Sequence, residues 1–374
     1  MNRLLKTAGW IFVILVGLIS TPPHTHGQQL KEMIAQAQKE GALRAQIIST
    51  ASPEANKIKQ AFLKRFGLNI NVDISFGNES TEYQKAETAL KTGGLPAFDV
   101  MNGEDGNNLN FINQGFLLKI DNWQALLAEI HPLVRSGKVK PAEISPEPFT
   151  GFSFLLGNRN KVLLYNTKLV SPDQLPQAYP DLADPKHQGK FAVPPWSSTW
   201  EMGRLVYPQD KWLQTVDTIG KNAAGVMTFA ASLERILLGD LWYAQSNFEY
   251  VWSTKAKDPN APLGYKIFKD ATFMNRVLYA VPLRSRHPAA ATLFGLWMTT
   301  DEGRMLLSPA HWQENVEVGQ TEMDMQVREA IKASKTKVVS WFQDEKARAE
   351  LKWLSTPDGK KYSEAIGRAL TQRK

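Results

Sequence analysis

The chain has 374 residues, more than a single hydrophobic core normally serves, so two domains or lobes are expected. Its hydrophobic content of 43% and charged content of 22% are those of a folded globular protein, which excludes disorder over most of its length. The formal charge of +7 includes no long run of Lys or Arg, so we expect no nucleic-acid partner. The chain has no cysteine, which excludes disulfides, thiolate zinc sites, a cysteine nucleophile and a lipidated cysteine.

The N-terminus has the pattern of a secretory signal peptide, which we predict to be residues 1–27. Arg3 and Lys6 precede an uncharged apolar stretch over 8–20, and small residues lie just before Gln28. The apolar stretch is shorter than the roughly 20 residues that cross a bilayer, which favours cleavage over a retained anchor. We therefore expect the mature protein to begin at residue 28 and to be free in the periplasm.

The first part of the mature chain alternates between helical and extended patterns. Apolar residues at helical spacing from Leu30 to Ala37 predict a helix, and strict alternation from Leu68 to Phe76 predicts a strand buried on one face. Further elements are expected as strands over 43–49 and 97–101 and as helices beginning at 52, 80 and 109. Strands that alternate with helices of this length predict βαβ units and a parallel sheet.

The second part of the chain is richer in loops between shorter elements. Strands are expected over 153–156, 161–165, 190–193 and 277–281, and helices over 200–206, 212–220, 232–238, 288–300 and 301–307. Beyond about residue 320 the chain is charged and helical, and no strand pattern is present. We assign no function to that last stretch.

The sequence motifs of common enzymes are missing. There is no Gly-x-Ser-x-Gly, His-Glu-x-x-His, phosphate-binding loop or Gly-x-Gly-x-x-Gly. Four histidines follow residue 27, namely His131, His187, His287 and His311, and none stands at metal-ligand spacing from another. We therefore expect no catalytic residue, no metal and no cofactor. An exported enzyme remains an alternative that measurable turnover would support.

Two loops in the first part of the chain have the chemistry of a binding site. Ser49, Thr50 and Ser52 lie between a predicted strand and a helix start, where an open α/β sheet binds ligands and helix N–H groups are free. Glu104 and Asp105 form the one acidic pair in an evident loop. Their carboxylates suit hydrogen bonding to a ligand or a contact on lobe closure, and turn formation or helix capping is the alternative.

Further candidates lie in the second part. Trp196, Ser197, Ser198 and Thr199 follow a short predicted strand and offer hydroxyl donors beside an indole face. Thr228, which follows another predicted strand, and Trp242 complete the predicted binding residues. Packing in the hydrophobic core is the alternative for the aromatic members of this set.

Several segments, in order along the chain, resemble those of the bacterial extracellular solute-binding proteins of ABC transporters, and in particular the group related to the ferric-iron-binding proteins. The similar segments are Lys39–Leu43, Pro96–Val100, Gly115–Leu117, Tyr165–Val170, Leu182–Lys186, Gly189–Pro194, Pro288–Phe294 and Asp301–Gly303. The resemblance implies an α/β periplasmic-binding-protein fold of type II, with two lobes, two crossing segments and a ligand cleft between the lobes. On this basis we divide the mature chain into a discontinuous first lobe, 28–146 and 277–374, and a second lobe, 147–276.

The resemblance also implies how such a protein works. A small ligand is captured by hinge closure of a monomer, which then docks on the membrane permease of an ABC transporter. The hydroxyl-rich loops and indoles favour an organic ligand, and an anionic group on it would suit the helix N-termini.

One departure from the family pattern bears on the ligand. Iron-binding members carry adjacent tyrosines where this chain reads Tyr243 to Phe248 without such a pair. A ferric-iron carrier without the tyrosine pair and a periplasmic ligand sensor domain remain the alternatives.

Overall fold

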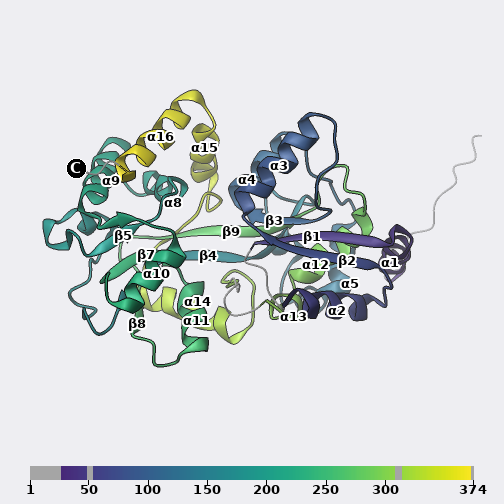
Figure 1. Cartoon of the computed structure of the whole chain (residues 1–374). Helices are drawn as coiled ribbons and strands as arrows, with labels where there is room; N and C mark the ends of the chain where they lie inside the picture. The colour runs from purple at the N-terminus through teal and green to yellow at the C-terminus, as the bar shows by residue number, and fades with distance from the viewer. Residues whose placement is uncertain (1–26, 49–53, 308–313, 372–374) are drawn as a thin grey trace, which may run out of the picture.

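The computed structural model describes residues 27–48, 54–307 and 314–371. Two bodies of helices and strands lie side by side, and two long strands run from one body into the other (Figure 1). These are β4 (Ser153–Asn166) and β9 (Thr272–Ala280), which pair antiparallel. Within the described residues no helix combines the length and the apolarity needed to cross a membrane.

The body that contains the start of the chain, here called the N-terminal lobe, is built on a short parallel sheet. In it β1 pairs with β2 in parallel, and an isolated bridge joins Ala45 of β1 to Val100. Phe62 packs on Phe294 and Trp297 in the core, with ring centroids 5.3 and 5.8 Å away. The elements of this lobe are α1 (Gln28–Glu40), β1 (Ala42–Ile48), α2 (Glu54–Phe66), β2 (Asn71–Gly77), α3 (Glu79–Lys91), β3 (Met101–Glu104), α4 (Asp105–Asn113), α5 (Trp123–Ile130), α6 (Pro132–Arg135), α7 (Pro141–Ile144), α12 (Pro288–Met298) and α13 (Asp301–Arg304).

The strand predicted over 97–101 and the loop after it differ from the structure. The strand β3 begins at Met101, and α4 begins directly after it at Asp105. The ring of Tyr83 in α3 lies where a Cβ on Gly103 would stand, at 2.6 Å, so glycine lets β3 pass close to α3. Asn108 donates to the carbonyl of Gly103 at 3.0 Å, which ties the new helix to the strand end.

The other body, here called the C-terminal lobe, surrounds a mixed sheet. β4 pairs antiparallel with β7 and β8, whereas β5 is parallel to β6 and β7. The elements of this lobe are two 3-10 turns (Tyr179–Ala183 and Pro185–His187), β5 (Phe191–Val193), α8 (Ser198–Glu201), a 3-10 turn (Met202–Leu205), α9 (Gln209–Asn222), β6 (Gly225–Val226), α10 (Phe229–Leu238), β7 (Tyr243–Asn247), α11 (Glu249–Lys257), β8 (Leu263–Lys266), α14 (Glu322–Ser334), β10 (Val338–Val339), α15 (Glu345–Leu354) and α16 (Pro357–Thr371).

The two strands predicted over 153–156 and 161–165 are one continuous strand, β4, whose pairing with β9 shifts register between Leu155 and Gly157. Beyond that shift its side chains alternate between two cores. Leu163 packs with Tyr179 and other residues on one face of the sheet, and Leu164 packs on the opposite face. One strand therefore links the lobes and organises both cores of the C-terminal lobe.

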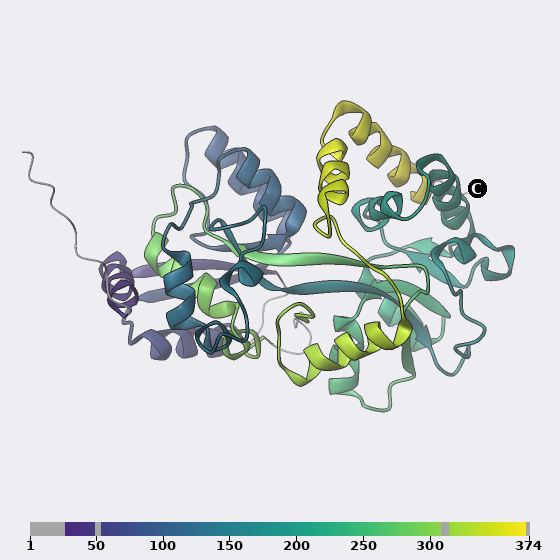
Figure 2. The same ribbon diagram turned by 180° about the vertical axis from the view of Figure 1, so that it is seen from behind.

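The last three helices pack on the C-terminal lobe, whereas the sequence analysis grouped all of 277–374 with the first lobe. In both views the yellow helices α15 and α16 lie beside α8 and α9 (Figure 1, Figure 2). Val327 of α14 and Ile366 of α16 belong to the cores of this lobe. An amphipathic pattern shows that one face of a helix is buried, but it does not identify the core that covers it.

Candidate functional site

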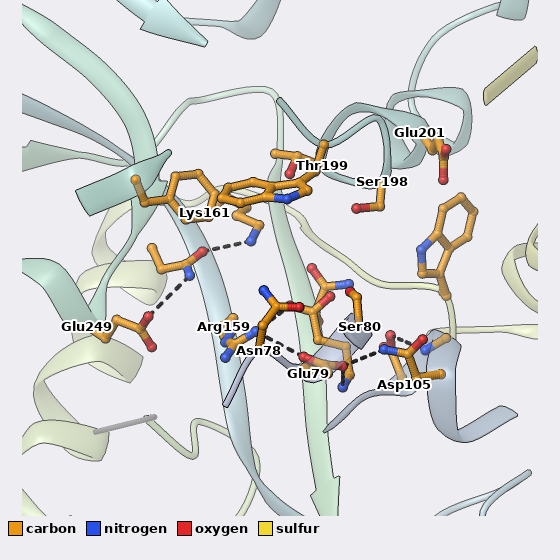
Figure 3. Close-up of a pocket in the computed structure, with 18 of the residues that line it drawn as sticks. Asn78, Glu79, Ser80, Asp105, Arg159, Lys161, Ser198, Thr199, Glu201 and Glu249 are labelled. Atoms are coloured by element: carbon orange, nitrogen blue, oxygen red, sulfur yellow. Dashed lines mark hydrogen bonds and ion pairs between the residues drawn. The ribbon is translucent and has the colours of Figure 1, made fainter. Parts of the chain in front are cut away.

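A cleft of about 490 Å³ lies where the two lobes face each other across β4 and β9, within the size range of small-molecule sites. Figure 3 shows Glu79, Asp105 and Arg159 on one side of it and Ser198, Thr199 and Glu201 on the other. Both lobes and both crossing strands line it. The lining residues are Asn78, Glu79, Ser80, Glu104, Asp105, Gly106, Asn107, Arg159, Lys161, Trp196, Ser198, Thr199, Glu201, Phe229, Asn247, Glu249, Tyr250, Asn275, Trp341 and Leu351.

The N-terminal lobe presents an acidic pair held by one arginine. Glu79 is the first residue of α3, and its carboxylate accepts hydrogen bonds from the backbone N–H of Glu104 and from Asn107 Nδ2 at 2.7 Å. Arg159 reaches across from β4, with Nη1 2.7 Å from Glu104 Oε1 and 3.6 Å from Glu79 Oε2. The guanidinium therefore holds α3 and the start of α4 to the crossing strand.

Burial separates the pKa values of these carboxyl groups. Desolvation, helped by the charge of Glu104, raises the pKa of Glu79 to about 7. Desolvation followed by the same neighbouring charge raises the pKa of Asp105 to about 7. Burial also opposes ionisation of Glu104, but Arg159 and Lys161 outweigh it and hold the pKa of Glu104 below its usual range. Glu104 is thus the carboxylate that stays charged at neutral pH.

Lys161, two residues further along β4, points into the cleft from the C-terminal lobe (Figure 3). Its Nζ donates to Asn247 Oδ1 at 2.7 Å and lies 5.1 Å from the ring centre of Phe229. Burial lowers the pKa of Lys161 and raises the pKa of nearby Glu249. Asn247 joins the two groups, because its Nδ2 donates to Glu249 Oε1 at 3.4 Å.

An aromatic wall closes the C-terminal side of the cleft. Trp196 is 41% exposed and packs its indole on Phe229 at 5.0 Å between ring centroids. Phe229 in turn contacts Tyr250 edge-on at 6.2 Å. Trp341 and Leu351, from the segment that packs on this lobe at the end of the chain, complete the rim. The wall offers both ring faces and ring edges to a ligand.

Five of the predicted binding residues line this one cleft, namely Glu104, Asp105, Trp196, Ser198 and Thr199. Ser197 and Thr228 are immediate neighbours of lining residues but are engaged within the protein. Ser197 Oγ donates to Glu201 Oε1 at 2.8 Å, and the side chain of Thr228 caps α10 by accepting from the backbone N–H of Ala231.

Trp242 does not line the cleft. Trp242 packs against the core of the C-terminal lobe, with its ring centre 4.2 Å from Lys190 Nζ. Ser49, Thr50 and Ser52 lie outside the described residues, as do residues 1–26, which hold almost all of the predicted signal peptide. The sequence analysis missed Arg159, Lys161 and Asn275, which stand on crossing strands. For Arg159 and Lys161 the available signal was the polar stretch Gly157–Lys161 between two apolar stretches.

The tyrosine that stands where the iron-binding group has its pair is not part of the cleft. Tyr243 is buried in the C-terminal lobe, and its hydroxyl lies 2.6 Å from His187 Nδ1. In the part of the chain that the structure describes, no three His, Asp or Glu side chains are grouped to hold a metal ion.

A third segment crosses between the lobes, in addition to the two expected. Residues 314–321 are the described part of the connection that leads into α14, and they run along β4. There Asn158 Nδ2 donates to Glu317 Oε2 at 2.8 Å, and Val316 N donates to Asn158 Oδ1 at 2.9 Å. Because the C-terminal helices belong to the other lobe, the chain has to cross once more.

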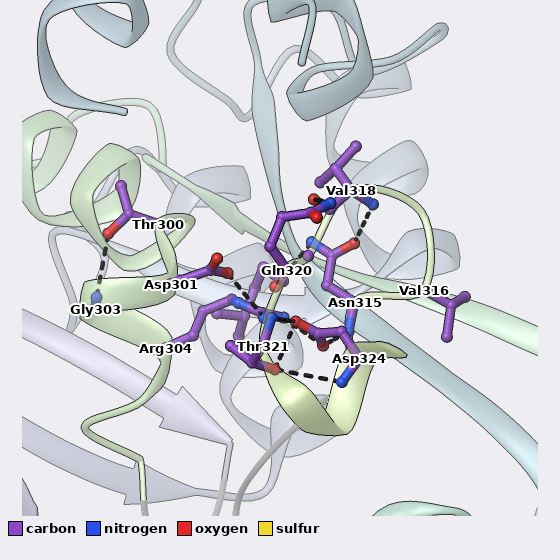
Figure 4. A network of polar contacts seen from close by, with 12 residues as sticks. Thr300, Asp301, Gly303, Arg304, Asn315, Val316, Val318, Gln320, Thr321 and Asp324 are labelled. Atoms are coloured by element: carbon purple, nitrogen blue, oxygen red, sulfur yellow. Dashed lines mark hydrogen bonds and ion pairs between the residues drawn. The ribbon is translucent and has the colours of Figure 1, made fainter. Parts of the chain in front are cut away.

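A buried ion pair anchors this third segment (Figure 4). Arg304 of α13 and Asp324 of α14 are 1% and 0% exposed and form a salt bridge across the lobes. Asp324 also accepts from the backbone N–H of Asn315 at 2.6 Å and of Thr321 at 3.1 Å. The carboxylate thus fixes both ends of the segment.

Two lobes joined by crossing strands, with a polar and aromatic cleft between them, define the class of bilobal ligand-binding proteins. Residues 57–308, well over half of the chain, match the family of bacterial extracellular solute-binding proteins. The chain belongs to this family. A search of curated protein sequences finds no matching relative.

Solved structures share the fold at low sequence identity. The iron-bound HitA protein from Pseudomonas aeruginosa is 17% identical with a TM-score of 0.66, over 87% of this chain and 99% of that one. The substrate binding protein of an ABC transporter from Agrobacterium tumefaciens is 15% identical with a TM-score of 0.63, over 88% and 97%. The spermidine/putrescine-binding PotD from Streptococcus pneumoniae is 13% identical with a TM-score of 0.60, over 87% and 99%.

Proposed function

We propose that this protein is the periplasmic solute-binding component of an ABC importer, which captures a small organic ligand in the cleft and releases it chemically unchanged. The observation that carries the proposal is the cleft itself, lined from both lobes and crossed by β4 and β9. The names of similar structures support it, since two of them are substrate-binding proteins of ABC transporters.

In this proposal Glu104 and Asp105 contact the ligand from the N-terminal lobe, and Trp196, Ser198 and Thr199 contact it from the C-terminal lobe. A ligand held by both sides binds the closed form more tightly than the open form. That difference in affinity, and nothing else, drives closure. The crossing segments absorb the change in backbone angles, and the lobes move as rigid bodies.

The family places the protein outside the cytoplasm, and we infer that residues 1–27 are removed on export. In support, α1 begins at Gln28, so the proposed cleavage site directly precedes the first helix of the fold. The closed form would then dock on a membrane permease powered by a cytoplasmic ATPase. An equivalent docking on a membrane sensor would use the same closed surface, and a permease gene beside this one would favour transport.

The test combines a thermal-shift screen with small-angle scattering. A library of organic acids, amino acids, sugars, phosphonates, amines and ferric citrate is added to the purified protein. A ligand at 100 times its dissociation constant adds about 2.7 kcal/mol to the free energy of unfolding. We expect a stabilising compound to be recovered intact and to lower the radius of gyration.

The variant Trp196→Ala should weaken binding of that compound, and Leu238→Ala, which alters a residue 70% exposed outside the cleft, should not. A protein that converts the compound, or stabilisation without compaction, would contradict the proposal.

A further inference from the structure

We propose that the ligand is an organic cation, bound through an ammonium group by the carboxylates and aromatic rings of the cleft. This rests on the proposed function and departs from the expectation of an anionic ligand. Three features of the cleft support it: the ionisable groups that line it, the carboxylates at its helix N-termini and its aromatic wall.

The charges that line the cleft are mostly negative. Five lining residues are acidic, namely Glu79, Glu104, Asp105, Glu201 and Glu249, and only Arg159 and Lys161 are basic. Arg159 is already engaged by Glu104 at 2.7 Å and by Glu79 at 3.6 Å. Among the described residues no salt bridge joins a basic side chain to the carboxyl groups of the other three, so an ammonium group that enters the cleft can pair with them.

The helix N-termini that an anion would need are occupied by these same carboxylates. Glu79, Asp105 and Glu249 are the first residues of α3, α4 and α11, and Glu201 lies in the single turn of α8. A carboxylate in the first turn satisfies the partial positive charge of a helix end. A ligand carboxylate would therefore meet protein carboxylates at these helix ends.

The aromatic wall suits an ammonium group. Indole and phenyl faces attract cations through their quadrupole, and the attraction is stronger in a desolvated site. The cleft already holds one such contact, because Lys161 Nζ lies 5.1 Å from the ring centre of Phe229. Trp196, packed on that same ring, leaves much of its surface open to the cleft and is the available partner for a second cation.

The carboxylates stand on both lobes, so closure brings them to the ligand from two sides. Figure 3 places Glu249 and Glu201 at opposite ends of the cleft, with Asp105 across from Glu201. An ammonium group held by carboxyl groups of both lobes would be fully paired only in the closed form. The same carboxyl groups would therefore both select the ligand and favour closure.

The experiment uses matched probes of one carbon skeleton and opposite charge. Binding of 1,4-diaminobutane, 4-aminobutanoate and butanedioate is measured by calorimetry on the purified protein, with longer diamines, their dicarboxylate counterparts, choline and ferric citrate beside them. We expect one or more of the amines to bind and none of the dicarboxylates. The variants Glu201→Gln and Glu249→Gln should each weaken the binding amine roughly tenfold. Glu364→Gln, an exposed change on α16, is the matched control.

The outcomes separate this inference from the proposed function. If an anion, an uncharged solute or ferric citrate binds and no amine does, the organic cation is wrong and the receptor stands. If no compound in this set of probes or in the thermal-shift library binds, both the organic cation and the proposed function are wrong. If an amine binds equally well to both cleft variants, with their unfolding temperatures unchanged, the carboxylates do not recognise it and the inference is overturned.

Discussion

Two carboxyl groups of the cleft, those of Glu104 and Asp105, differ from each other although they are adjacent in the sequence. Glu104 is paired with Arg159 and stays ionised, whereas adjacent Asp105 is buried, and its oxygens accept from the backbone N–H groups of Gly106 and Arg276 at 2.9 and 3.2 Å. The backbone donors do not offset the cost of burying the charge, so the pKa of Asp105 rises to about 7.

This shift predicts how stability depends on pH. The ordinary pKa of Asp105 is 3.8, so between that pH and about 7 the folded protein holds a proton that the unfolded chain has released. The stabilisation that Asp105 contributes to the folded state is full below pH 3.8 and is lost as the pH rises through about 7. The free energy of unfolding should fall in this window, by at most about 1.4 kcal/mol per pH unit from this group.

Urea unfolding of the protein and of Asp105→Asn at pH 5, 6, 7 and 8 measures the effect. The difference between the two free energies should shrink or reverse as pH rises. A difference that stays constant over this range would show that Asp105 does not titrate there. Burial also raises the pKa of Glu314 to about 7. Glu314 is present in both proteins, so its contribution cancels in the difference.

Two tryptophans of one loop show how closely packing and binding residues adjoin. Trp196 faces the cleft, whereas Trp200 is fully buried and its carbonyl accepts from Trp212 Nε1 at 2.8 Å. The turn of α8 between them places one indole outside the core and the other inside it. Their spacing in the sequence does not distinguish these two environments.

At the scale of elements, α16 packs closely against α9 at a glycine of α9. Gly220 is buried, and a Cβ there would collide with the carbonyl of Ala369, so the two helices approach more closely than side chains allow. Ile219 of α9 and Ile366 of α16 belong to the same core. The contact is what attaches the end of the chain to the C-terminal lobe.

We expect Gly220→Ala to force these helices apart and to lower the free energy of unfolding by about 1–3 kcal/mol. Gly367→Ala is the matched control, because a Cβ at this helical position meets open space. It should raise stability by about 0.5–1 kcal/mol, since alanine favours a helix over glycine. Guanidinium unfolding of both variants checks the prediction. Equal effects of the two changes would contradict the close contact.

Much of the architecture was predictable from local patterns. The alternation of apolar residues from Leu68 to Phe76 predicted β2. The predicted loop with Glu104 and Asp105 contributes both of these residues to the lining of the cleft. The register and direction of the strands were not predictable, because the antiparallel pairing of β4 with β9 joins residues that are about 120 positions apart in the sequence. For the same reason Arg159, which lay between two predicted strands, and Lys161, at the start of one, were not predicted as cleft residues, and only the fold brings them to Glu104 and Asn247.

At the scale of the whole molecule, three segments connect the lobes. The third, 314–321, is tied down by the buried pair of Arg304 and Asp324. A buried carboxylate that loses its cation keeps its desolvation cost, so breaking the pair costs more than the pair contributes. The pair therefore holds the third segment firmly to both lobes.

A double-mutant cycle tests this role. Arg304→Met and Asp324→Asn should each lower the free energy of unfolding, the first by about 3–5 kcal/mol. The double variant should be less destabilised than the sum of the two, because the partners share one interaction. Urea unfolding at pH 7 provides the values. Additive losses would mean that the two side chains act independently.

The position of α16 has a consequence for the order in which the protein can fold. Its residues Ile366 and Leu370 complete a core that includes Val216 and Phe191, which stand far earlier in the chain. Until α16 has been synthesised, the apolar face of α9 therefore has no cover, and the C-terminal lobe cannot complete this core. We expect this lobe to fold only after that helix is present.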